Sequence, residues 1–199
     1  IAGHDETDST SYAGEFIKTA DKLNSDRKLT IAVIENYLNE ASDEVKAALN
    51  SAIEKLKSFG HNIVYKNLLN SKYDIATYYI IATAEASANL SRYDGVRYGN
   101  RAKSANLKEL YANTRGEGFG DEVKRRMLLG TFVLSSGYYD AYYIKAQKAR
   151  AYIKAEYEEI FKDADLIFMP IAPSVAYKFG ELSDPLTAYL SDIYTIGVN

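Results

Sequence analysis

The chain has 199 residues, enough for one substantial domain, and 47% of them are apolar while 26% are charged. These values are typical of a soluble globular protein, and a net charge of −3 gives no electrostatic sign of bulk nucleic-acid binding. The absence of cysteine excludes disulfides and thiol nucleophiles. No apolar run reaches the roughly 18 residues of a membrane span, so a cytoplasmic protein is expected.

Residues 1–12 are polar and rich in turn-forming side chains. His4 lies close in sequence to the acids Asp5, Glu6 and Asp8, a composition that metal sites share. A single histidine without further ligand spacing makes a metal site the weaker interpretation. We expect a loop held by hydrogen bonds from short side chains to the backbone.

A strand, a helix and a second strand follow in close succession. Residues 27–34 (RKLTIAVI) are largely β-branched and apolar, which predicts a strand. Residues 43–59 repeat apolar positions with a period of about 3.6, with Ser42 as the N-cap and Gly60 as the stop, which predicts a helix. Residues 61–68 (HNIVYKNL) predict the second strand. Because the joints are short, we expect a βαβ unit with parallel strands.

Residues 73–90 are rich in alanine and predict a helix that packs closely through small side chains. Tyr78 lies on the same face of this helix as Ala82 and Glu85. From its position alone, Tyr78 is better explained as a core aromatic residue than as a ligand contact.

Residues 91–120 contain few apolar side chains, and one short helix at residues 107–113 is expected within them. A partner subunit or an RNA backbone could use the basic side chains of this segment, although a solvated surface is the simpler interpretation. These side chains include Arg97, Arg101, Lys103 and Arg115.

Residues 118–143 predict a helix that begins exposed and enters a core. Its apolar part, residues 127–134, is expected to be covered on all sides. Arg125 and Arg126 lie near the helix start, where a cation is unfavourable unless it holds an anion. Gly130 follows Arg126 by one turn and is expected to leave room beside the guanidinium. The competing interpretation is an arginine paired with a local acid.

The helical pattern continues to about residue 161, with Gly137 as a bend or a break. Residues 165–170 predict a short buried strand, and residues 186–193 predict a short helix. Asp192 then falls near the C-terminal end of that helix, where a carboxylate is unfavourable without a neighbouring cation or ammonium group. Asp192 is therefore a candidate binding residue.

No catalytic set is recognisable from residue types and spacing alone. The two histidines lie in turn-like settings, and neither a zinc pattern nor a G-x-S-x-G elbow occurs. The doublet Ser135–Ser136 lies within a helical pattern and lacks the glycines that expose a nucleophile. We interpret this doublet as small-residue packing.

A resemblance to a known family spans residues 3–199. The chain resembles the A subunits of glutamyl-tRNA(Gln) amidotransferases, a branch of the amidase signature family, in the stretches KRRMLLGTFVLSSGYYDAYY, DETDSTS and SANLSRYDGVRYG. The resemblance implies an α/β fold, a mixed β-sheet flanked by helices on both sides. It also implies that residues 1–199 are a single incomplete domain, the part downstream of the catalytic serine loop.

The chemistry implied by the resemblance is hydrolysis of glutamine by a serine nucleophile, a second serine joined by a cis peptide and a lysine base. The GSSGGS-like loop that carries these serines does not occur in the sequence, so the chain alone is expected to be inactive. The resemblance assigns the glutamine carboxylate to Arg126, the amino group to Asp192 and the pocket wall to Tyr78. One departure is Ile171, because the chain has PIAP where the family usually has PTAP.

The resemblance also implies partners. Ammonia from glutamine passes to a B subunit, which uses ATP and Mg to convert Glu-tRNA(Gln) to Gln-tRNA(Gln), and a small C subunit wraps the contact between the other two. Since ATP and Mg belong to the B subunit, no cofactor or metal is expected in this chain, and no membrane partner. Unpaired strand edges favour self-association of the isolated chain.

Two other interpretations stay open. A general amidase of the same fold would act on another amide and would lack the clamp formed by Arg126 and Asp192. A non-catalytic module would instead bind tRNA or a partner subunit through the basic surface of residues 92–115.

Overall fold

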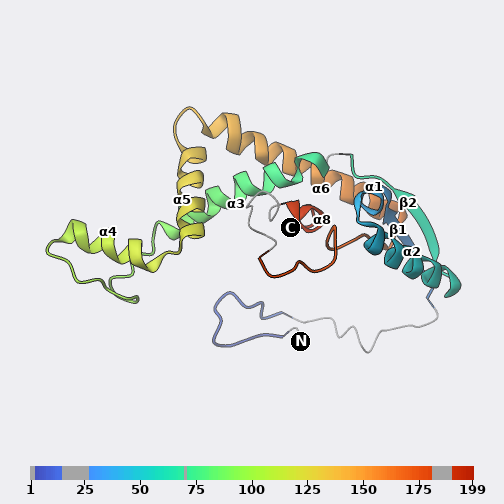
Figure 1. Ribbon diagram of the computed structural model, residues 1–199, viewed down its shortest axis with the longest axis horizontal. Coiled ribbons are helices and arrows are strands. Elements are labelled where there is room, and N and C mark those ends of the chain that lie inside the picture. The colour runs from blue at the N-terminus through green and yellow to red at the C-terminus, as the bar shows by residue number, and fades with distance from the viewer. Residues whose placement is uncertain (1–2, 15–26, 70, 181–189) are drawn as a thin grey trace.

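The computed structural model describes residues 3–14, 27–69, 71–180 and 190–199. Figure 1 shows a small sheet with its covering helices at one end of an elongated molecule. Two long helices, α3 (Asp74–Leu90) and α6 (Lys145–Asp163), run along the middle. An arm that carries α4 (Leu107–Gly118) extends from the other end.

Within the described residues, the sheet has three parallel strands in the order β2-β1-β3. β1 (Thr30–Ile34) is central and almost completely buried, and it pairs with β2 (Asn62–Lys66) and β3 (Leu166–Phe168). The three expected strands and the parallel βαβ unit are confirmed. All described strands run in the same direction, so the sheet shows no antiparallel member in this part of the chain.

Helices cover both faces of the sheet. On one face, Val33 of β1 packs against Ile53 of α2 (Asp43–Ser58). On the other face, Ala32 and Ile34 pack against Ile160 of α6. Alternate residues of β1 therefore belong to two separate apolar clusters, as a central strand requires. The α/β fold with helices on both sides, implied by the resemblance, is confirmed.

The ends of α2 follow from local chemistry. Ser42 is the N-cap, and its side chain accepts a hydrogen bond from the Val45 amide. Gly60 has a φ of +84°, a backbone conformation that glycine adopts without steric cost, and the chain turns there into β2. The short helix α1 (Glu35–Glu40) precedes α2 and was not expected from the sequence.

The helix α5 (Asp121–Leu134) crosses α3 at close range. A Cβ on Gly130 would lie 1.9 Å from the Thr83 carbonyl oxygen and 2.7 Å from the Ser87 Cβ. The backbone of α3 therefore occupies the space beside Gly130, and the expectation that this glycine leaves room beside the Arg126 guanidinium is wrong. Small side chains on α3 permit this approach, so the prediction of close packing through α3 is confirmed.

The expectation that residues 127–134 are covered on all sides is also wrong for the described part of the chain. Leu128 is 74% exposed and Phe132 is 44% exposed, whereas Gly130 and Val133 are buried. The buried residues form a narrow stripe that faces α3. A continuous apolar run predicts full coverage only when neighbours pack on every side, and α3 covers one side.

Gly137 ends the helical run. Its φ is +89°, and α5 stops at Leu134 before a π-helical turn (Tyr139–Ile144) that leads directly into α6. The sequence left open whether Gly137 bends or breaks the helix, and the structure shows a break. α6 then extends to Asp163, close to the expected end.

The C-terminal part is described only from Leu190 onward. Residues 181–189, which hold most of the helix expected at 186–193, lie outside the described residues. Asp192 is the N-cap residue of the short helix α8 (Ile193–Ile196). Asp192 therefore precedes α8, while Leu190, two residues before it, is helical, and the expected position of Asp192 near the C-terminal end of a helix at 186–193 rests on residues outside the described ones. Within the described residues, no helix is long and apolar enough to cross a membrane.

Candidate functional site

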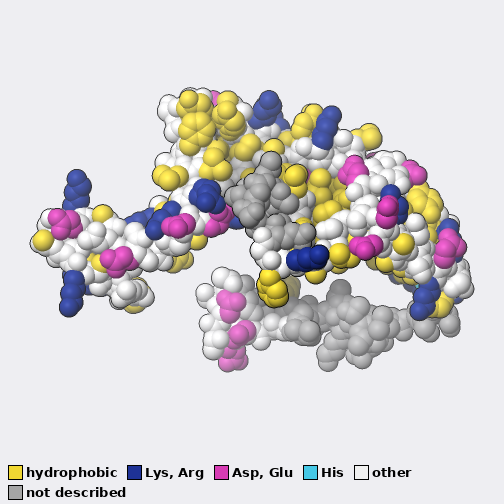
Figure 2. Space-filling model, in the orientation of Figure 1, with side chains coloured by type: hydrophobic (Ala, Val, Ile, Leu, Met, Phe, Trp, Pro, Cys, Tyr) yellow, Lys and Arg dark blue, Asp and Glu magenta, His cyan; other side chains and the backbone are white. Residues whose placement is uncertain are grey.

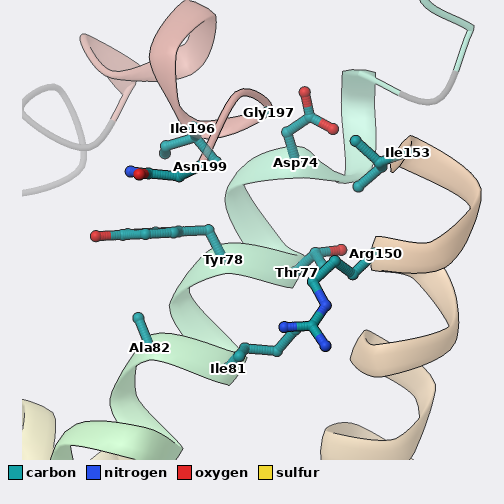
Figure 3. A pocket seen from close by; sticks show the side chains of 10 residues that line it. All are labelled: Asp74, Thr77, Tyr78, Ile81, Ala82, Arg150, Ile153, Ile196, Gly197 and Asn199. Atoms are coloured by element: carbon teal, nitrogen blue, oxygen red, sulfur yellow. The ribbon is translucent and has the colours of Figure 1, made fainter. Parts of the chain in front are cut away.

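A cavity of about 350 Å³ lies between α3, α6 and the C-terminal segment. This volume falls in the range of small-molecule sites. Figure 3 shows its walls, with α3 on one side, α6 on the other and the segment after α8 above. Ten residues line it: Asp74, Thr77, Tyr78, Ile81, Ala82, Arg150, Ile153, Ile196, Gly197 and Asn199.

Residues one turn apart on α3 face this cavity. Asp74, Tyr78 and Ala82 follow the i, i+4 spacing that places side chains on the same helix face. In Figure 3 the Tyr78 ring lies beneath Asn199, and the Arg150 guanidinium reaches across from α6 towards α3. Tyr78, which the sequence treated as a core aromatic or a pocket residue, therefore lines a pocket.

Asp74 is buried, with only 2% of its surface exposed. The Tyr37 hydroxyl donates a hydrogen bond of 3.0 Å to Asp74 Oδ2. The other carboxyl oxygen, Oδ1, has no hydrogen-bond partner among the described residues. Burial raises the pKa of Asp74 to about 6, the hydrogen bond from Tyr37 opposes that shift, and Glu156 adds to it.

Two further groups close the space around this carboxyl. The Tyr157 hydroxyl is buried without a hydrogen-bond partner in the described part of the chain. Burial, together with the Asp74 charge, raises the pKa of Tyr157 to about 12. A Cβ on Gly197 would lie 2.6 Å from Asp74 Oδ2 and 2.9 Å from the Tyr157 hydroxyl oxygen. Glycine is thus the residue that lets the C-terminal segment lie against both groups.

Arg126 lies on α5, outside the residues that line this cavity. Its Nε donates a hydrogen bond of 3.0 Å to Glu122 Oε1, and its guanidinium lies 5.8 Å from the centre of the Tyr79 ring. The hydrogen bond with Glu122 raises the pKa of Arg126, and the phenol groups of Tyr79 and Tyr78 act in the same direction. The local acid expected as the simpler interpretation is therefore present, and Tyr78 is an electrostatic neighbour of Arg126.

The neighbouring arginine is oriented differently. Arg125 also forms an ion pair with Glu122, but its side chain is 58% exposed compared with 37% for Arg126. Since Arg126 has the more buried side chain and the aromatic contact with α3, the geometry favours Arg126 over Arg125 as the residue that faces α3.

Asp192 is exposed at the start of α8 and does not line the cavity. The structure therefore brings Tyr78 and Arg126 into one electrostatic neighbourhood, and it gives no contact between Asp192 and either of them. The assignment of glutamine to these three residues stays a prediction.

The sequence did not point to Asp74 or Arg150. Asp74 opens an otherwise apolar helix, which is ordinary for a first-turn acid and gives no sign of burial. Arg150 lies among alternating charged and apolar residues of α6 and looks like a solvated side chain. The polar groups of the lining are a carboxyl, a hydroxyl, a phenol, a guanidinium and an amide, from Asp74, Thr77, Tyr78, Arg150 and Asn199.

The N-terminal loop is built as expected. Asp5 accepts hydrogen bonds from the amide and hydroxyl of Thr7, and Asp8 accepts the equivalent pair from Thr10. No group of three or more potential metal ligands occurs among the residues that the structure describes.

Comparisons with known proteins agree on the family. The model of the Amidase family matches residues 1–199. The chain is 82% identical over 199 residues to the A subunit of glutamyl-tRNA(Gln) amidotransferase from Campylobacter hominis, and 75% identical over the same length to that from Campylobacter curvus. In both cases the match covers the whole chain and 44% of the relative, so the chain spans less than half the length of these proteins.

Two solved structures are similar in fold. The A subunit of glutamyl-tRNA(Gln) amidotransferase from Thermotoga maritima has a TM-score of 0.66 at 33% identity, covering 98% of this chain and 38% of that one. A bacterial aryl acylamidase of the amidase signature family has a TM-score of 0.64 at 14% identity, covering 98% of this chain and 40% of that one. The second likeness shows the fold alone. With a family model matched from the first residue to the last, the chain belongs to the amidase family.

Proposed function

We propose that this chain is the part of a glutamine-hydrolysing amidotransferase subunit that forms one wall of the glutamine pocket. The observation that carries this proposal is the 82% identity, over the whole chain, to the A subunit of a glutamyl-tRNA(Gln) amidotransferase. In the parent protein, glutamine hydrolysis supplies ammonia for the conversion of Glu-tRNA(Gln) to Gln-tRNA(Gln). B and C subunits complete the cytoplasmic complex, and the B subunit binds ATP and Mg.

The geometry around α3 supports a clamp for an amino acid. Arg126 uses its Nε for Glu122, and among the described residues its two terminal nitrogens donate no hydrogen bond. Those two nitrogens are the pair that grips a carboxylate in bidentate fashion. The phenol groups of Tyr79 and Tyr78 both act to raise the pKa of Arg126, and the guanidinium lies 5.8 Å from the centre of the Tyr79 ring, which supports a position of this side chain beside the tyrosine pair of α3.

The remaining parts of the proposal come from the resemblance. Asp192 would attract the α-ammonium group of glutamine, and a serine outside these 199 residues would attack the side-chain amide. An acyl-enzyme forms as ammonia leaves, and water then releases glutamate. Without that serine and its lysine base, the isolated chain hydrolyses no glutamine.

Adjacent arginines provide a matched test in the full-length protein. Arg126→Ala is expected to raise the KM for glutamine by about 10- to 100-fold with a smaller effect on kcat, because a charge-assisted bond to the bound carboxylate is lost. Arg125→Ala, which removes the more exposed partner of Glu122, is the control and is expected to change KM less than about threefold. Ammonia release measured against glutamine concentration provides both constants.

The same assay distinguishes the alternatives. An unchanged KM in Arg126→Ala contradicts the clamp and favours a general amidase, for which hydrolysis of simple aliphatic amides should then exceed that of glutamine. Asp192→Asn should raise KM in the same direction as Arg126→Ala if the two residues hold opposite ends of one amino acid.

A further inference from the structure

The arm formed by residues 91–120 is a self-contained unit. Thr114 of α4 accepts a hydrogen bond of 3.1 Å from the Ala102 amide, and Asn113 donates one of 3.2 Å to Ser104. Arg115 donates hydrogen bonds to the carbonyls of Leu90 and Tyr93 and stacks over Phe119, with its guanidinium 5.0 Å from the ring centre. These contacts connect the loop of the arm to α4 and anchor the arm to the end of α3.

Two Arg–Tyr pairs lie within the loop of this arm, at Arg92–Tyr93 and Arg97–Tyr98. A glycine follows each pair closely. Gly95 has a φ of +74°, and a Cβ on Gly99 would lie 2.9 Å from the Gly95 Cα. The loop thus doubles back on itself where only glycines fit.

The tight loop leaves its tyrosines in solvent. Tyr98 is 99% exposed and Tyr93 is 64% exposed. Tyrosine carries a large apolar ring, and exposing two of them within one short loop leaves aromatic faces without a partner. Beside them, a hollow of about 400 Å³ lies between the loop and the end of α4, lined in part by Tyr93, Asp94 and Phe119.

The charge of the arm is opposite to that of the chain. Residues 91–120 hold six Lys and Arg against three Asp and Glu, in a chain whose net charge is −3. Arg115 is used inside the arm, whereas Arg92, Arg97 and Arg101 are exposed and form no ion pair among the described residues. Figure 2 shows basic side chains projecting from both edges of the arm.

We propose that this arm binds unpaired nucleotides of an RNA, with Arg92, Arg97 and Arg101 at the phosphates and with Tyr93 and Tyr98 as stacking faces for bases. Cations that flank exposed aromatic rings are the pattern of single-stranded nucleic-acid sites. Arg and Tyr are also enriched at protein interfaces, so the choice of RNA rests on the positive charge balance of the arm, which has six basic and three acidic side chains. The proposal rests on the proposed function for the identity of the RNA, a tRNA.

Binding of a fluorescein-labelled tRNA(Gln) transcript to the full-length protein in its complex tests the arm. Kd is measured from about 50 to 200 mM KCl, because each phosphate contact adds about 0.7 to 0.9 to the slope of log K against log salt. The double variant R97Q/R101Q should lower that slope by about 1 to 2. The control K145Q/K148Q removes two lysines of α6 and should leave the slope unchanged.

The tyrosine makes a separate contribution. Tyr98→Ala should weaken binding by roughly 5- to 100-fold at every salt concentration, because stacking is lost while phosphate contacts remain. Tyr98→Phe keeps the ring and should retain the affinity. Tyr152→Ala removes a tyrosine of α6 that is 69% exposed and serves as the control.

Several results would overturn the proposal. One is an R97Q/R101Q variant with the same slope and affinity as its control. Another is a normal tRNA affinity with loss of the complex in size-exclusion chromatography, which would assign the arm to a protein partner. Glutamine hydrolysis without tRNA is measured in parallel. Hydrolysis that persists in an arm variant with unchanged tRNA binding refutes this inference alone, whereas absence of hydrolysis in the unmodified complex refutes the proposed function alone.

Discussion

Asp74, in the lining of the cavity between α3 and α6, presents one carboxyl oxygen to Tyr37 and leaves the other without a hydrogen-bond partner among the described residues. A buried acid in this state favours its protonated form. The α3 helix N-terminus stabilises the ionised form, but the raised pKa shows that burial dominates. The free energy of unfolding should therefore depend on pH through the protonation of Asp74.

The pH dependence has a definite sign. The pKa of Asp74 is about 6 in the folded protein and 3.8 as its ordinary value, so the folded state binds the proton more tightly. The contribution of Asp74 to the free energy of unfolding is greatest below about pH 4 and falls by about 3 kcal/mol in total as the pH rises from there through 6. Asp74→Asn keeps an acceptor for Tyr37 and should remove that fall.

Urea unfolding of the full-length protein at about pH 4.5 and about pH 7.5 measures this difference. The control is Asp121→Asn, because the Asp121 side chain is 96% exposed. The difference between the two pH values should shrink in Asp74→Asn and stay the same in Asp121→Asn. Equal differences in all three proteins would show that Asp74 does not titrate in this range.

At the scale of elements, the contact of α5 with α3 depends on the absence of a side chain. Gly130 faces the Thr83 carbonyl across the helix crossing, and the exposed side of α5 carries Leu128 and Phe132. The Phe132 ring continues into an aromatic cluster with Tyr138 and Tyr142 of the next segment. The face of α5 that contains Gly130 therefore packs against α3, whereas the face that carries Leu128 and Phe132 is exposed.

Gly130→Ala is expected to lower the free energy of unfolding by about 1 to 3 kcal/mol, because a methyl group 1.9 Å from a carbonyl oxygen forces the two helices apart. Gly116→Ala is the matched control. Gly116 lies in α4 with nothing within 4 Å of an added Cβ, so alanine should raise stability by up to about 1 kcal/mol. Thermal unfolding that lowers the Tm in both variants alike would argue against the close crossing.

At the scale of the whole molecule, the sequence best predicts the part that contains the β-sheet and its covering helix α2. β1, α2 and β2 are local elements with clear periodicity, a serine cap and a stop glycine, and each formed where its pattern indicated. The close contact of Gly130 with α3 could not be predicted from the sequence, because a glycine within a helix is compatible either with empty space or with a closely packed neighbour. Burial of Asp74 also depends on Tyr37 and Gly197, which are far from it in sequence.

The outer strands give a prediction for the isolated chain. Within the described residues, β2 and β3 each pair with β1 alone, and the outward face of α5 is apolar. Unpaired edges and exposed leucines favour association between copies. Light scattering after size exclusion should show a mass that increases with concentration for the 199-residue chain. A constant monomer mass up to concentrations on the order of 100 μM would contradict this expectation.

The two carbonyls that Arg115 holds are those of the last residue of α3 and of the turn after it. The Arg115 guanidinium therefore connects the arm to the C-terminal end of α3. Hydrogen bonds within the arm connect its loop to α4. Loss of the hydrogen bonds from Arg115 should loosen the orientation of the arm relative to α3, while Gly120 still joins the arm directly to α5. The orientation of the arm toward a large ligand therefore depends on Arg115 together with the chain connections to α3 and α5.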